Sequence, residues 1–114
     1  SNRVTVEEAP IKVLVPAAAL LNTPNKITAA DFEHWVQERG LYFFGAASPE
    51  YQDLLSSADP WPYNTGEKVG LLTTAKVGRG TWTYLGIGLW RQLPAGTTGA
   101  YRLLANLVAQ PRGR

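Results

Sequence analysis

The sequence predicts one small domain of the α/β or α+β class. Three observations lead to this prediction: β-rich runs alternate with amphipathic helical patterns, one β-hairpin is strongly marked, and 114 residues suffice for one hydrophobic core. Hydrophobic residues make up 45% of the chain and charged residues 18%, which is typical of a globular domain. We therefore treat residues 1–114 as a single domain.

The first third of the chain predicts two strands and a helix. Arg3–Val6 alternates polar and apolar residues, and Ile11–Val15 is a second short β-rich run. Residues 28–39 predict a helix, because Thr28 and Asp31 have the spacing of a capping box. The apolar face of this helix would consist of Phe32, Trp35 and Val36, and Gly40 would end it.

Two further elements are predicted before the hairpin. Leu41–Phe44 is a continuous run of strand-forming residues, which favours a strand buried on both faces. Residues 48–55 predict a second short helix, with Ser48 as its N-cap and Pro49 in its first turn.

The strongest local pattern is the hairpin. Residues 69–77 and 81–89 are both β-rich, and Gly78 and Gly80 in the connection can take positive φ. Because both faces of the second run are apolar or aromatic, we expect an interior strand. After a turn at residues 93–96, a C-terminal helix is predicted over about 98–109. Its buried stripe would consist of Ala100, Leu103, Leu104, Leu107 and Val108.

Residues that build common catalytic and metal centres are scarce. The chain has one histidine, His34, and no cysteine, which excludes thiolate sites and the usual three-ligand zinc centres. No serine lies in a Gly-x-Ser-x-Gly motif, and no glycine pair extends to a phosphate-binding fingerprint. The sequence therefore predicts no catalytic residue, no metal and no cofactor.

Charge and hydropathy restrict the partners. The net charge is +2, and the basic residues form no dense stripe, which argues against a nucleic-acid partner. No apolar run approaches the ~20 residues of a membrane span, and no leader pattern opens the chain, so we expect no membrane partner. The lack of cysteine leaves the compartment open, with the cytoplasm as the default expectation.

Two polar clusters that adjoin apolar runs form a candidate ligand site. Residues 37–39 lead into the predicted strand 41–44, and Arg91 and Gln92 follow the second hairpin strand. Charged groups beside aromatic rings are common ligand contacts, but they equally often pair with one another, here Glu38 with Arg91 or Arg39. A small-molecule site would be lined by Trp35, Glu38, Arg39, Tyr42, Arg91 and Gln92.

Several segments together carry a family resemblance. They are Pro24–Thr28, Asp31–Phe32, Trp35–Phe43, Arg91–Gly96, Gly99–Leu103 and Ala105–Leu107. In these segments the chain resembles the C-terminal region of bacterial PIG-L type (LmbE-like) deacetylases. The resemblance implies a partial class I glutamine amidotransferase-like fold with a mixed sheet, of which this chain would be the later half. The metal ligands of that family lie in its deacetylase domain and have no counterpart here.

These features predict a non-enzymatic binding or assembly module. The alternative is a small hydrolase, or an accessory subunit of a carbohydrate-derivative deacetylase, with a small polar or carbohydrate-like ligand. A deep pocket between Tyr42 and Arg91 would favour the alternative, and a flat apolar surface would favour the module. A half-sheet leaves a strand edge and an apolar face uncovered, so we expect self-association as a symmetric dimer. Candidate surfaces are Ile11–Val15, Leu41–Phe44 and the second hairpin strand.

Overall fold

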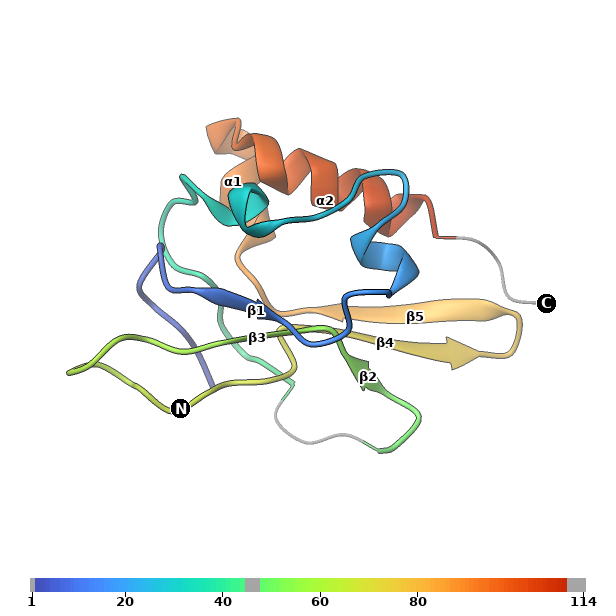
Figure 1. Ribbon diagram of the computed structural model, residues 1–114, viewed down its shortest axis with the longest axis horizontal. Helices are drawn as coiled ribbons and strands as arrows, with labels where there is room; N and C mark the ends of the chain where they lie inside the picture. Colours follow the sequence, from blue (N-terminus) through green and yellow to red (C-terminus); the bar gives the residue numbers. More distant parts are fainter. Residues whose placement is uncertain (1, 45–47, 111–114) are drawn as a thin grey trace.

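The computed structural model describes residues 2–44 and 48–110, which form a mixed α+β fold (Figure 1). The described residues contain two antiparallel sheets, two α-helices and two short 3-10 helices. In chain order these are β1 (Ile11–Val13), η1 (Ala19–Leu21), η2 (Ala29–Phe32), β2 (Gln52–Asp53), β3 (Leu55–Ser57), β4 (Leu72–Val77), β5 (Gly80–Leu85), α1 (Leu89–Ala95) and α2 (Thr98–Val108).

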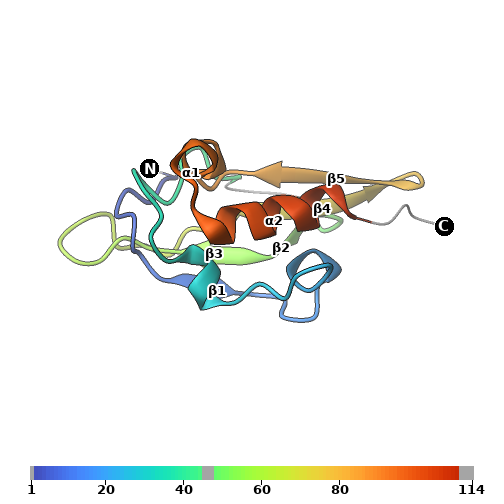
Figure 2. The same cartoon turned by 90° about the horizontal axis from the view of Figure 1, so that it is seen from above.

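The two sheets are joined through a single residue. One sheet pairs β1 with β3, and the other has the order β2-β4-β5. Leu54 lies between β2 and β3: its N–H donates to the carbonyl of Leu72 (2.9 Å) and its carbonyl accepts from the N–H of Leu14 (2.9 Å). The strands thus form one continuous layer, and α2 covers one face of it (Figures 1 and 2).

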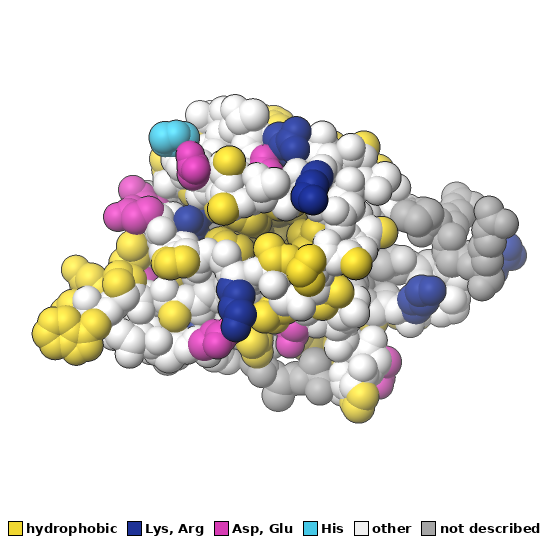
Figure 3. All heavy atoms as spheres, viewed as in Figure 1, with side chains coloured by type: hydrophobic (Ala, Val, Ile, Leu, Met, Phe, Trp, Pro, Cys, Tyr) yellow, Lys and Arg dark blue, Asp and Glu magenta, His cyan; other side chains and the backbone are white. Residues whose placement is uncertain are grey.

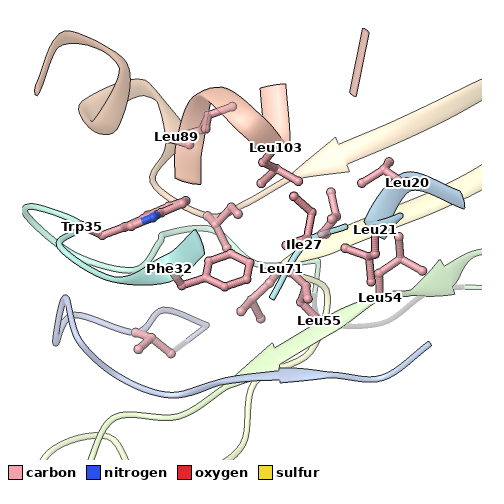
Figure 4. Close-up of a cluster of buried hydrophobic side chains, with 14 of the residues drawn as sticks. Leu20, Leu21, Ile27, Phe32, Trp35, Leu54, Leu55, Leu71, Leu89 and Leu103 are labelled. Carbon is pink, nitrogen blue, oxygen red and sulfur yellow. The ribbon is translucent and has the colours of Figure 1, made fainter. Parts of the chain in front are cut away.

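The hydrophobic core lies between this layer and the helices. Leu103 of α2, Leu71 and Leu55 are fully buried, and Phe32 and Trp35 close the cluster beside α1 (Figure 4). Burial of each such leucine contributes roughly 2 kcal/mol.

The predicted C-terminal helix is confirmed as α2, in which Ala100 and Leu103 are buried and Leu104 and Leu107 pack against this core. The prediction that Val108 belongs to the buried stripe is wrong, because Val108 lies in the last turn and is 78% exposed.

The predicted hairpin is confirmed as β4 and β5. The register pairs Val77 with Gly80, which leaves Gly78 and Arg79 as a two-residue turn, and Gly78 has a φ of 58°. A positive φ at the first central residue suits the right-handed twist of a hairpin. The prediction of an interior second strand is wrong, because β5 pairs with β4 alone among the described strands and is an edge strand.

The predicted helix over residues 28–39 is also wrong beyond its first turn. The capping box of Thr28 and Asp31 forms, with the Thr28 N–H donating to Asp31 Oδ2 (2.8 Å), but η2 ends at Phe32. The indole of Trp35 donates to the carbonyl of Asp31 (2.8 Å), and the guanidinium of Arg39 donates to that of Phe32 (2.6 Å). Side chains therefore satisfy the carbonyls that a longer helix would have used.

Residues 41–44 do not form the predicted strand. Their backbone N–H groups donate to three separate segments: Leu41 to Gly86, Phe43 to Asn2 and Phe44 to Gly70. No single neighbour runs alongside this segment, and Tyr42 has a left-handed φ of 55°, which interrupts an extended strand.

The predicted helix over residues 48–55 is replaced by β2 and β3. Leu54 and Leu55 are both buried because the chain leaves one sheet and enters the other at this point. Two adjacent buried leucines also fit the apolar side of a helix, so the sequence pattern favours the wrong element.

The remaining boundaries differ less. The predicted strand 3–6 is reduced to a bridge between Val4 and Gly40, and β1 ends at Val13. The first hairpin strand begins at Leu72 and not at residue 69, because Gly70 has a left-handed φ of 78°, and the second hairpin strand ends at Leu85. The expected turn at 93–96 belongs to the end of α1.

Candidate functional site

The six residues predicted to line a ligand site divide into a buried and an accessible group. Trp35, Arg39 and Gln92 are only 3%, 4% and 0% exposed. Tyr42 is 80% exposed, the Arg91 side chain is 42% exposed and that of Glu38 is half-buried. The structure thus places three of the candidates inside the fold and three at its surface.

Gln92 lies on α1 and binds the backbone of the loop that follows η2. Its Oε1 accepts the N–H of Val36 (2.7 Å), and its Nε2 donates to the carbonyls of Val36 (2.7 Å) and Gly88 (3.0 Å). The side-chain amide therefore pairs with Val36 as a neighbouring strand would. Gln92 fastens this loop to α1.

Arg39 fastens the other end of the same loop. Its Nε donates to the carbonyl of Ala9 (2.7 Å) and its Nη1 to that of Phe32 (2.6 Å), while its guanidinium carbon lies 5.9 Å from the centroid of the Trp35 ring. Burial lowers the pKa of Arg39 to about 10, against the opposing influence of Glu8 and Glu7. The side chain therefore stays charged at neutral pH, and its two carbonyl contacts compensate for its desolvation.

Glu38 and Arg91 face a shallow, open hollow of about 620 Å³. Arg91 Nε lies 3.9 Å from Glu38 Oε1, and its Nη1 donates to Gln37 Oε1 (2.9 Å), so the pairing of Glu38 with Arg91 considered above forms. Gln37 and Glu38 have left-handed φ values of 34° and 69°, which turn this segment outward between its two anchors. The hollow is lined by Thr5, Val6, Glu7, Glu8, Gln37, Glu38 and Arg91.

Tyr42 does not share this hollow. It lines a separate depression with Asn2, Arg3 and Leu41, and its carbonyl accepts the hydroxyl of Tyr84. Residues 41–44 begin beside the end of β5, where the Leu41 N–H donates to the Gly86 carbonyl (3.0 Å). Whether any of the six residues binds a ligand stays a prediction.

Aromatic side chains form a cluster on the outer sheet face, on the opposite side from α2. Trp82 and Tyr84 alternate with core-facing residues along β5 and stack with ring centroids 6.3 Å apart. Phe44 and Tyr51 complete the cluster, at 5.3 Å from Tyr84 and 5.6 Å from Trp82 respectively. Trp82 is still 42% exposed. The i, i+2 spacing of the two rings on β5 is the sequence signal that indicates this face.

The outer edge of β5 presents unpaired backbone groups. The turn makes Val77 and Gly80 a hydrogen-bonded pair, so Gly80, Trp82 and Tyr84 direct their N–H and C=O groups toward β4. The alternate residues Thr81, Thr83 and Leu85 direct theirs away from β4. No described residue bonds to these outward groups, and Figure 2 shows β5 at the rim of the sheet.

A second exposed aromatic feature lies at the tip of the loop between β3 and β4. Trp61 and Tyr63 are largely exposed there, and neither ring packs against another aromatic ring of the described residues. Figure 3 shows hydrophobic side chains gathered on this protrusion at the left, whereas charged side chains are scattered over the rest of that face.

The part of the chain that the structure describes holds no metal centre and no membrane-spanning helix. Within residues 2–44 and 48–110, no three acidic or histidine side chains are grouped so that they could hold a metal ion. In the same residues, no helix combines the length and the apolar character needed to cross a membrane. No protein-family model, characterised protein or solved structure matches this chain.

Proposed function

We propose that this chain is a non-enzymatic assembly module that receives an extended strand of another polypeptide at the outer edge of β5. The observation that carries the proposal is the row of outward backbone groups at Thr81, Thr83 and Leu85. A strand added to a sheet edge gains affinity from main-chain hydrogen bonds and specificity from alternate side chains. The aromatic face beside this edge would supply the side-chain contacts on which specificity depends.

The candidate ligand site supports this function over the alternative of a hydrolase or ligand-binding subunit. Three of its six residues are buried, with Arg39 and Gln92 bonded to backbone groups of the fold. The accessible hollow at Glu38 and Arg91 is shallow, whereas binding sites for small molecules enclose most of the ligand surface.

The family resemblance supports an assembly function as well. We propose, as that resemblance implies, that the chain corresponds to the later half of an amidotransferase-like accessory domain. A half-domain lacks the strands that would continue its sheet, and it therefore leaves one edge without a neighbour. An open edge on β5 is the feature expected of such a fragment.

A synthetic peptide spanning residues 79–86 provides a direct test. We expect it to bind isotope-labelled chain, at a concentration where the chain is monomeric. The largest amide shifts should occur at Thr81, Thr83 and Leu85. A peptide N-methylated at its three alternate paired positions should not bind, because it cannot donate to the edge.

Two variants at one position provide the matched control. Thr83→Pro removes an outward N–H without breaking the β4 ladder, because Thr83 and Thr74 form a non-hydrogen-bonded pair. Thr83→Val retains the N–H. We expect only the proline variant to lose peptide binding while both stay folded by circular dichroism. Equal binding by both variants, or amide shifts confined to other segments, would refute strand addition at β5.

A further inference from the structure

We infer that the strand received at this edge is β5 of a second copy of the chain, in an antiparallel register with a two-fold axis at Thr83. This inference rests on the proposed function and names its partner. The first support is the self-complementarity of the edge. An isologous interface requires one surface to match its own copy. The edge meets this requirement, because Thr83 lies midway between Thr81 and Leu85 and the backbone groups of all three point outward.

The register follows from the outward groups. When Thr83 pairs with Thr83 of the second copy, Thr81 pairs with Leu85 of the second copy, and Leu85 pairs with Thr81 of the second copy. All three outward residues of each strand then exchange hydrogen bonds, which gives about six between the chains. A shift by two residues in either direction leaves one outward residue of each strand unpaired and retains about four. Backbone pairing therefore selects the register centred on Thr83.

The same register joins the two aromatic faces. The two-fold axis at Thr83 is perpendicular to the joined sheet, so the aromatic faces of both copies lie on the same side of it. Trp82 then lies opposite Tyr84 of the second copy, at a non-hydrogen-bonded position where cross-strand side chains approach most closely. The intrachain stack of Trp82 and Tyr84 would thus continue across the interface.

β5 also lacks the features that keep edge strands apart. Natural edge strands carry lysine, an inward charge, proline or a bulge to prevent pairing. The six residues Gly80–Leu85 contain no charged residue and no proline, and their register with β4 is unbroken. The net charge of +2 per chain is only a weak repulsion at physiological salt. Neither sequence nor charge opposes contact between two copies.

The interface should be a weak one. A single strand with two aromatic rings lies at the small end of specific interfaces, so we expect a dissociation constant on the order of tens of micromolar. Sedimentation equilibrium from about 1 µM to about 500 µM should then show the mass rising from 12.4 kDa toward twice that value. Trp82→Thr, which keeps a strand-forming residue, should weaken the dimer by roughly tenfold.

Cysteine variants test the register, because the chain has no cysteine of its own. Thr83→Cys should form an interchain disulfide under mild oxidation, since its Cα atoms would face each other at about 5.5 Å. Thr81→Cys should not, because the two Thr81 positions would lie about 14 Å apart, beyond the ~7 Å limit for a disulfide. Cross-linking at Thr81 in preference to Thr83 would overturn the register.

The outcomes separate the two proposals. If the peptide binds at β5 but the chain remains monomeric at the highest concentration and Thr83→Cys does not cross-link, the second copy is not the partner and strand addition stands. If the peptide also fails to bind, the edge receives no strand and both proposals fail. A dimer that persists unchanged in Thr83→Pro would place the contact between copies elsewhere and overturn this inference.

Discussion

Replacement of Gln92 by alanine tests whether this residue belongs to the fold or to a ligand site. The side chain is fully buried and connects α1 to Val36 and Gly88 by three hydrogen bonds of 2.7–3.0 Å. Alanine would remove one of the two donors to the Gly88 carbonyl, which still accepts the Arg91 N–H (3.2 Å), and would leave a cavity in place of the buried side chain; together these cost about 1–3 kcal/mol. The contacts to the more exposed Val36 add about 1 kcal/mol. We therefore expect a loss of about 3 kcal/mol in the free energy of unfolding.

Arg91→Ala is the matched control, because Arg91 is the next residue on the same helix and was predicted for the same site. Its side chain is 42% exposed, and its contact with Glu38 is a loose pair at 3.9 Å. Exposed pairs of this kind contribute about 0–1 kcal/mol after solvent screening. Gln92→Glu serves as a second control, since it keeps the size of the side chain but removes both Nε2 donors.

Urea unfolding followed by tryptophan fluorescence measures the difference. With a slope of about 1.5 kcal/mol per molar urea, the Gln92→Ala midpoint should fall by about 2 M, and the Arg91→Ala midpoint by less than about 0.7 M. Equal shifts for the two alanine variants would refute the assignment of Gln92 to the fold. A Gln92→Ala protein as stable as the native chain would do the same.

Two further variants test buried polar anchors by the same measurement. Arg39→Met fills similar space but leaves the carbonyls of Ala9 and Phe32 without their donor, so we expect a loss of about 2–4 kcal/mol; unchanged stability would contradict this role. Asn106→Leu removes the α2 amide that donates to the carbonyls of Leu20 (2.8 Å) and Asn25 (2.7 Å). It should cost about 2–4 kcal/mol, and a loss below about 1 kcal/mol would show that α2 docks through apolar contacts alone.

The hairpin and α2 could be predicted from the sequence because their determinants are local. A two-residue turn that begins with Gly78 and an apolar stripe at helical spacing each specify an element without distant partners. The helix over residues 28–39 failed for the opposite reason. There the indole of Trp35 and the guanidinium of Arg39 satisfy carbonyls that a helix would use, and Arg39 also reaches Ala9, far away in the sequence.

Of the candidate site, only the surface pair of Glu38 and Arg91 could be predicted from the sequence. Opposite charges such as Glu38 and Arg91 can be matched from the sequence, and the structure brings them together. The buried role of Gln92 could not be predicted, because a glutamine after a strand-like run looks the same whether it faces solvent or a loop backbone. The edge position of β5 was missed because its aromatic residues suggested burial on both faces. In the structure they pack on Phe44 and Tyr51 without a covering strand or helix among the described residues.

The interior and the rim of this sheet differ in how their polar groups are satisfied, and that difference is the strongest argument for assembly. Among the described residues, no buried side-chain nitrogen or oxygen lacks a hydrogen-bond partner. Arg39, Gln92 and Asn106 each bind distant backbone carbonyls, so the fold meets its internal requirements with few polar residues. At β5 the sequence could have protected the edge with one lysine or proline, yet Gly80–Leu85 has neither. In the described part of the chain, the contrast between paired buried side chains and an uncharged, regular edge strand supports the proposal that another strand is added at β5.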